Sequence, residues 1–196
     1  MVSLAKLGSV VGFLVLCLFA WSATSSLAVY PHSMSYFNEA VGGPEHGGEY
    51  LLDSNIDWGQ DLLYLKRWLE AHVEAKPLRL AYYNILDPRL LGIEFQLPPP
   101  GPPTFPEGNN AVPWASFGPR PGYYAISVCY LYGTIFSAPD GSGGSQQIDR
   151  HDYFAYFRRF QPIARAGYSI YIYRITPDEA AAERRRMGLP PLPGGR

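Results

Sequence analysis

The sequence predicts an α/β fold, in which one N-terminal transmembrane helix precedes a small α/β sandwich with a mixed, partly parallel sheet. Three observations predict it. The N-terminal 30 residues contain a long uncharged run, the later residues alternate strand-like and helix-like patterns, and 47% hydrophobic with 17% charged residues suits a folded core. We therefore expect a transmembrane helix or signal peptide over 1–30, an extracytoplasmic domain over 31–176, and a short helix with a disordered tail over 177–196.

The uncharged run extends from Leu7 to Tyr30 and is long enough to cross a bilayer, which takes about 20 apolar residues. Lys6 precedes the run and the next basic residue is Lys66, so the positive-inside rule puts the N-terminus in the cytoplasm and the domain outside. A cleaved signal peptide is the alternative, with Ser26-Leu27-Ala28 as its cleavage site. Either interpretation exports the residues after Tyr30.

The first elements of the exported part resemble a β-α-β unit. Residues 50–54 have the composition of a strand, 59–74 form an amphipathic helix, and 78–83 form a second strand. The apolar stripe of the helix consists of Leu62, Leu65, Leu69 and Val73. Asp87-Pro88 predicts a turn or short helix, and 93–97 predict a third strand.

Residues 97–122 are rich in proline, which predicts a long surface loop. Beyond this loop the strongest strand signal lies at 123–132, and a flexible glycine turn is expected at 141–144. Asp149 is the expected cap of a helix that extends to Phe160, and 168–175 alternate as a final strand. Thr176 and Pro177 then begin the last helix.

The densest polar chemistry lies where the strand at 50–54 is expected to end. Candidate sugar or ligand contacts there are Asp53, Asn55, Asp57, Trp58, Gln60 and Asp61. Carboxylates and amides bind hydroxyl groups, and an indole offers a stacking face for a sugar. The structural alternative is that Asp57 caps the helix and the segment is only a turn. In either case Trp58 is expected to be at least partly exposed.

Several classes of function are disfavoured. A net charge of −1 gives no basic field for a nucleic acid. Cysteine and histidine spacing indicates no zinc site, and the segment from Asp53 fails as a calcium loop because Trp58 and Tyr64 replace its glycine and glutamate. No cofactor and no catalytic residue are predicted. Arg184, Arg185 and Arg186 are expected on a solvated helix face, and the tyrosines of 123–132 and 168–175 in sheet packing.

Four stretches together carry a family resemblance: YPH at 30–32 with YFNE at 36–39 and GGP at 42–44; LLDSNIDWGQDL at 51–62; Asp87-Pro88 with Gly92-Ile93; and PIARAGYSI at 162–170. In this order they resemble the C-terminal end of bacterial membrane glycosyltransferases of the dolichyl-phosphate-mannose protein mannosyltransferase type. Those proteins span the membrane many times and use sugars linked to polyprenyl phosphate. The DSNIDWGQDL block is the most specific part of the resemblance.

The resemblance implies an extracytoplasmic domain that follows a last membrane helix. The family's catalytic acidic residue lies in an early external loop, among membrane helices for which this chain has no counterpart. We therefore expect a domain that is inactive alone and whose partners are the membrane and a multi-spanning glycosyltransferase core. The alternative is an independent anchored or secreted carbohydrate-binding module that binds a glycan.

Overall fold

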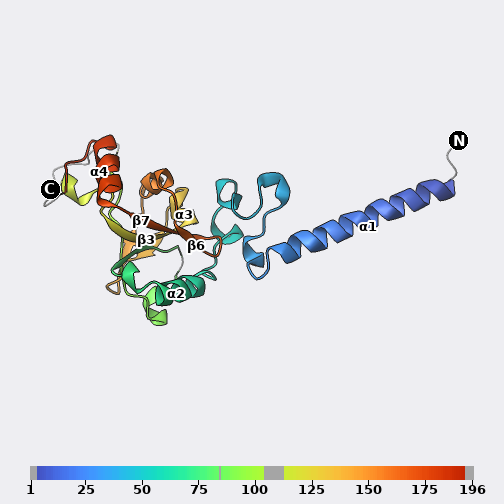
Figure 1. Ribbon diagram of the computed structural model, residues 1–196, viewed down its shortest axis with the longest axis horizontal. Helices are drawn as coiled ribbons and strands as arrows, with labels where there is room; N and C mark the ends of the chain where they lie inside the picture. Colours follow the sequence, from blue (N-terminus) through green and yellow to red (C-terminus); the bar gives the residue numbers. More distant parts are fainter. Residues whose placement is uncertain (1–3, 84, 104–112, 193–196) are drawn as a thin grey trace.

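A five-stranded sheet forms the centre of the computed structural model, which describes residues 4–83, 85–103 and 113–192 (Figure 1). In spatial order its strands are β2 (Phe95–Gln96), β1 (Leu78–Ala81), β3 (Gly122–Ser127), β7 (Ile170–Ile175) and β6 (Ala164–Ala166). Strand β1 is parallel to β2 and β3, whereas β7 is antiparallel to β3 and β6. The mixed, partly parallel sheet is therefore confirmed.

Helices cover both faces of this sheet. Successive side chains of a strand point to opposite faces, so they enter two different hydrophobic clusters. Tyr124 and Ile126 of β3 belong to one cluster, and Ala125 between them belongs to the other. Helix α2 (Leu62–Ala71) covers the second face with the buried Leu62, Leu65 and Leu69. The first face packs against α3 (Val128–Leu131), the 3-10 helix η8 (Ala155–Arg159) and α4 (Pro177–Arg186), so the sheet lies between two helical layers (Figure 1).

Smaller elements complete the fold. Strands β4 (Ser137–Pro139) and β5 (Ser145–Gln147) form a separate hairpin, and the glycine turn predicted at 141–144 joins them. The Asp140 carboxylate accepts hydrogen bonds from the N–H groups of Ser142 and Gly144 in that turn. The other 3-10 helices are η1 (Ser33–Ser35), η2 (Glu39–Val41), η3 (Gly47–Glu49), η4 (Asp53–Asn55), η5 (Val73–Ala75), η6 (Pro88–Leu91) and η7 (Trp114–Ser116).

The strand predicted at 50–54 is wrong, and with it the β-α-β unit that it would begin. These residues lead from η3 into η4, and Asp53 has a φ of +62°, which breaks an extended conformation. Strand β1 already has β2 on one edge and β3 on the other, so no edge beside it is left for another strand. The parallel pairs are instead β1 with β2 and β1 with β3.

Two further elements differ from the prediction. The strand expected at 123–132 ends at Ser127, because the Ser127 hydroxyl accepts the N–H of Cys129 and caps α3. The helix expected from Asp149 to Phe160 is reduced to η8, with Phe154 at its N-cap position. Its first part is held by the proline-rich loop instead: the carbonyl of Tyr153 accepts from Gly101 N–H, and Arg150 donates to two carbonyls of that loop.

The last helix begins as predicted, with Thr176 and Glu179 forming a capping box. Its arginines do not all face solvent, however. The side chain of Arg184 is buried and donates to the carbonyls of Phe117 and Pro190, which tie the proline-rich loop and the tail to α4. Leu189 is buried as well, so the tail is packed at this position. The other residues of the predicted proline-rich loop, 104–112, and of the predicted disordered tail, 193–196, lie outside the described residues.

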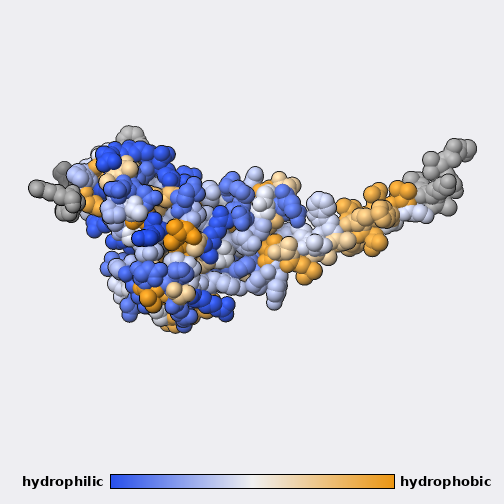
Figure 2. Space-filling model, viewed as in Figure 1, coloured by the Kyte–Doolittle hydropathy of each residue, from blue (hydrophilic) through white to orange (hydrophobic). Residues whose placement is uncertain are grey.

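Helix α1 (Leu4–Ala28) extends from the domain as a separate apolar rod (Figures 1 and 2). From Gly8 to Ala28 it is long and apolar enough to cross a membrane, and an N-terminal signal sequence has the same properties. Its last turns contact the domain: Ser25 bonds to the Tyr36 hydroxyl, and the Trp21 indole donates to Glu39. The chain that follows α1 therefore turns back and runs beside the last turns of this helix.

Candidate functional site

The structure divides the six candidate residues into a buried group and an exposed group. Asp57 and Asp61 are 2% and 0% exposed, whereas Trp58 is 59% exposed. Asp53 and Asn55 are exposed with Trp58, and Gln60 is half-buried. All six come from η4 and the turns that lead into α2, so one short segment presents different side chains to the core and to solvent.

This segment packs on the residues that follow α1. The Ser35 hydroxyl donates to the carbonyl of Ile56 over 2.9 Å, and the Gln60 amide donates to that hydroxyl over 3.2 Å. The same amide donates to the Ile56 carbonyl over 3.0 Å. The DSNIDWGQD segment is therefore bonded to the first turn of chain outside the apolar helix.

Asp57 connects the segment to the end of β3. One of its oxygens accepts the N–H of Gly59 over 2.8 Å, and the other accepts the Ser127 hydroxyl over 2.8 Å. The prediction that Asp57 caps the helix is wrong: the N-cap position of α2 belongs to Asp61, whose side chain makes no capping bond. The sequence could not show this, because Ser127 reaches Asp57 only when the sheet has formed.

Asp61 connects the segment to the turn between β6 and β7. Its carboxylate accepts the N–H groups of Tyr168 and Ser169 over 3.0 and 2.9 Å, and His32 Nδ1 lies 3.3 Å from its other oxygen. Gly167 in that turn has a φ of +58°, and a Cβ there would overlap the Asp61 carboxylate. A glycine is therefore required where the carboxylate enters the turn.

The two carboxylates form a polar centre below the surface. Burial raises the pKa of Asp57 to about 6, against the opposing hydrogen bonds from Gly59 and Ser127, and the negative charge of Asp61 raises it further. Burial also raises the pKa of Tyr82, as do the charges of both aspartates. The hydroxyls of Tyr82 and Ser169 are buried without a hydrogen-bond partner among the described residues. Both carboxylates are thus engaged by hydrogen bonds within the fold.

The exposed half of the segment uses most of its polar atoms internally. The Trp58 indole N–H donates to the carbonyl of Ser54 over 2.7 Å, and the Asn55 amide donates to the carbonyl of Leu52. Asp53 accepts the hydroxyl of Tyr83. The face of the Trp58 ring is accessible to a partner, and its predicted exposure is confirmed.

A second surface feature was missed by the sequence-based prediction. An open groove of about 580 Å³ is lined by the aromatic residues Tyr64, Trp68 and Tyr168 together with Arg67 and Arg165. His32 lines it too, with its ring 4.6 Å from that of Tyr64 and 5.3 Å from that of Tyr168. Tyr64 and Trp68 are four residues apart on α2, outside its leucine stripe, which is the signal the sequence offered.

Comparisons with known proteins give no match. No family model matches the chain, and no curated protein or solved structure is significantly similar to it. Within 4–83, 85–103 and 113–192 no three His, Cys, Asp or Glu side chains gather as metal ligands would. The function therefore has to be argued from the geometry of the site.

Proposed function

We propose that the chain is a non-catalytic, membrane-anchored extracytoplasmic domain of the polyprenyl-phosphate-dependent glycosyltransferase type. The observation that carries this proposal is the burial of Asp57 and Asp61 in the most specific block of the resemblance. A carboxylate that acts in sugar transfer has to reach its substrate, and these two contact Ser127 and backbone N–H groups instead.

The architecture supports a positioning role for this block. Through Ser35 and His32 it contacts the chain that leaves α1, and through Ser127 and Ser169 it contacts the ends of β3 and β7. The block therefore links the membrane-proximal chain to the sheet by several hydrogen bonds. We infer that this link holds the domain at a fixed height and orientation above the bilayer.

In this proposal α1 spans the membrane with its N-terminus in the cytoplasm, as the charge asymmetry between Lys6 and Lys66 favours. A multi-spanning core supplies the catalytic acid and the carrier-lipid site. Trp58 is the large hydrophobic side chain that the block exposes to solvent. We assign it to the contact with that core, since exposed tryptophans are common anchors of protein interfaces.

The contact is tested by a photo-crosslinking amino acid at position 58 of the full chain in native membranes. The matched control carries it at exposed Arg185 on α4, which lies at the end of the domain away from α1 (Figure 1). We expect position 58, and not 185, to crosslink to a membrane protein that transfers sugar from a polyprenyl-phosphate donor. Equal crosslinking at both positions, or none at 58, would contradict the proposal.

A carbohydrate-binding module is the second candidate, and the aromatic groove favours it. Tyr64, Trp68 and Tyr168 provide ring faces, and Arg67 and Arg165 provide donors for hydroxyl groups. Thermal unfolding with a panel of mono- and disaccharides tests it on the wild type, on Tyr64→Ala and on Trp58→Ala. A sugar that raises the melting temperature of all but Tyr64→Ala would place glycan binding in the groove. No shift with any sugar would exclude this candidate.

A further inference from the structure

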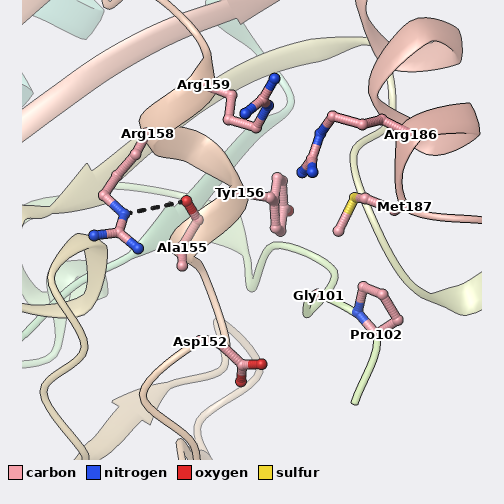
Figure 3. A pocket seen from close by; sticks show the side chains of 9 residues that line it. All are labelled: Gly101, Pro102, Asp152, Ala155, Tyr156, Arg158, Arg159, Arg186 and Met187. Atoms are coloured by element: carbon pink, nitrogen blue, oxygen red, sulfur yellow. Dashed lines mark hydrogen bonds between the residues drawn. The ribbon is translucent and has the colours of Figure 1, made fainter. Parts of the chain in front are cut away.

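An open pocket of about 620 Å³ lies between η8, α4 and the proline-rich loop, at a place that the proposed function does not use (Figure 3). Arg158 and Arg159 line it from η8, and Arg186 lines it from α4. Figure 3 shows the side chains of Arg159 and Arg186 converging beside Tyr156, with Arg158 on the other side of the η8 backbone. Two elements far apart in the sequence thus bring guanidinium groups together.

The positive charge of these groups is only partly neutralised. Glu183, whose side chain is 8% exposed, pairs with Arg159 over 3.3 Å and with Arg186 over 2.5 Å, so one carboxylate serves two guanidiniums. Arg150 pairs with Asp152 over 2.9 Å at the rim. Counting Arg158, four arginines and two acids make up this set, and 4 − 2 leaves two positive charges.

The guanidinium groups also keep hydrogen-bond donors available. Among the described residues, Arg159 donates only through Nε, to Glu183, and Arg158 donates only through Nε, to the carbonyl of Ala155. The side chains of Arg159 and Arg186 are 55% and 47% exposed, so their remaining N–H groups are accessible. Paired N–H groups of arginine match the oxygens of phosphate and carboxylate groups in both spacing and charge.

The rest of the pocket limits the kind of ligand. Tyr156 and Met187 add apolar surface beside the guanidiniums, which suits an organic group attached to the anion. Helix α4 lies at the end of the molecule opposite α1 (Figure 1). A lipid headgroup of the bilayer that α1 enters is therefore far from the pocket, and a soluble ligand reaches it more readily.

We propose that this pocket binds the phosphate or pyrophosphate group of a soluble ligand. The two positive charges in excess match a dianion. Arg159 and Arg186 converge on it from η8 and α4, and Arg158, on the other side of the η8 backbone, contributes its charge. The proposal does not depend on the glycosyltransferase assignment, because no residue of the DSNIDWGQD block takes part.

Titration calorimetry on the purified full chain in detergent tests the proposal, with pyrophosphate, inorganic phosphate and citrate as separate probes. We expect pyrophosphate to bind most tightly and citrate most weakly. Arg159→Gln and Arg186→Gln should each weaken pyrophosphate binding by about tenfold or more, the effect of losing one charge-assisted contact. Each variant leaves Glu183 paired with the other arginine. Arg185→Ala, next to Arg186 but outside the pocket lining, is the matched control and should bind as the wild type does.

Four results would overturn the proposal. The first is no binding of pyrophosphate, and the second is equal weakening by Arg185→Ala, which would indicate nonspecific attraction of the α4 arginines. The third is citrate binding as tightly as pyrophosphate, which would indicate a carboxylate site. Short-chain phosphatidic acid serves as the lipid probe, and its binding in place of the soluble anions would overturn the assignment to a soluble ligand. Melting temperatures of all variants verify that they are folded.

Discussion

At the scale of single residues, the Asp61 carboxylate is the acceptor for two backbone N–H groups in the turn before β7. It lies at 0% exposure and accepts the N–H groups of Tyr168 and Ser169 in the turn before β7. A buried N–H group without an acceptor costs free energy, so the carboxylate stabilises the turn by accepting these two hydrogen bonds. Its role is comparable to that of a helix cap, but the capped element is a turn about a hundred residues away in the chain.

Asp61→Ala should therefore lower the free energy of unfolding by about 2–6 kcal/mol, because the buried N–H of Ser169 and the partly buried N–H of Tyr168 each lose an acceptor worth about 1–3 kcal/mol. Asp149→Ala is the control, since Asp149 is exposed and should change stability by at most about 0.5 kcal/mol. Denaturant unfolding of the two variants compares them. Equal stability of both would contradict the structural role of Asp61.

Asp57 predicts a specific dependence of stability on pH. Its folded-state pKa, raised to about 6 by burial, lies above the usual value near 3.8, so the folded state binds the proton more tightly than the unfolded state. The contribution of this group to stability is thus fully present below about pH 4 and decreases as the pH rises to about 6. The difference of about two pKa units corresponds to about 3 kcal/mol.

Asp57→Asn removes this titration and keeps an oxygen that accepts the Ser127 hydroxyl. Between pH 4 and pH 7 the wild type should therefore lose up to about 3 kcal/mol more unfolding free energy than Asp57→Asn does. Denaturant unfolding at several pH values measures the difference. Parallel pH profiles for the two proteins would contradict the raised pKa.

The sequence located this cluster but not its orientation. Six polar and aromatic residues in nine positions predicted a site, and the structure keeps them together. Which of them are buried depends on Ser127 and on the turn at 167–169, which are separated from the block by more than 60 residues. A local pattern carries no information about such partners. Asp57 was therefore predicted as a cap, and the buried Asp61 was included with the exposed Trp58 among the candidate ligand contacts.

At the scale of elements, α1 is longer than the part of it that a bilayer core can cover. Its last two turns run beside the chain at 36–39, where the Trp21 indole donates to the exposed Glu39 carboxylate. A charged carboxylate is strongly disfavoured in hydrocarbon, and tryptophan favours the interface. If α1 spans the membrane, we therefore expect Trp21 in the outer interfacial region, with the last turn of α1 leaving the hydrocarbon core.

Cysteine labelling tests this boundary in a Cys17→Ser background. An impermeant maleimide added to intact cells should label a cysteine at Thr24 and leave one at Leu14 unlabelled, because only position 24 is expected near the outer face of the bilayer. Two results would contradict the boundary and the orientation. One is labelling of Leu14→Cys alone, and the other is labelling of neither variant although the N-terminal segment is uncleaved. A mature protein that begins at Val29 would identify the segment as a cleaved signal peptide.

Elements with a complete local signal were predicted well. The leucines of the α2 stripe, the alternation of β7 and the Thr176-Pro177 start of α4 all appear in the structure. Val73, predicted to continue the stripe, lies beyond α2 in η5 and is exposed. The elements that failed lacked information about their surroundings. Residues 50–54 have strand-like composition, but β1, the strand that they were expected to accompany, is already paired on both sides. The apolar residues 128–131 continue the pattern of β3, although Ser127 caps a helix there.

At the scale of the whole molecule, the features are ordered along its long axis. The apolar helix lies at one end, the chain bonded to the DSNIDWGQD block follows it, and α4 with the arginine pocket lies at the far end (Figures 1 and 3). This order fits a domain that is held above a membrane and offers one surface to the membrane and another to solutes. We propose that the buried carboxylates of the DSNIDWGQD block serve this architecture and not sugar transfer by the chain itself.

Transfer of radiolabelled sugar from a polyprenyl-phosphate donor by the purified full chain in detergent tests that claim most directly. We predict no transfer above a protein-free blank, for the wild type and for Asp57→Asn alike, because both buried carboxylates are engaged by the fold. Transfer by the wild type that Asp57→Asn abolishes, while its melting temperature at pH 7 stays at or above that of the wild type, would contradict it.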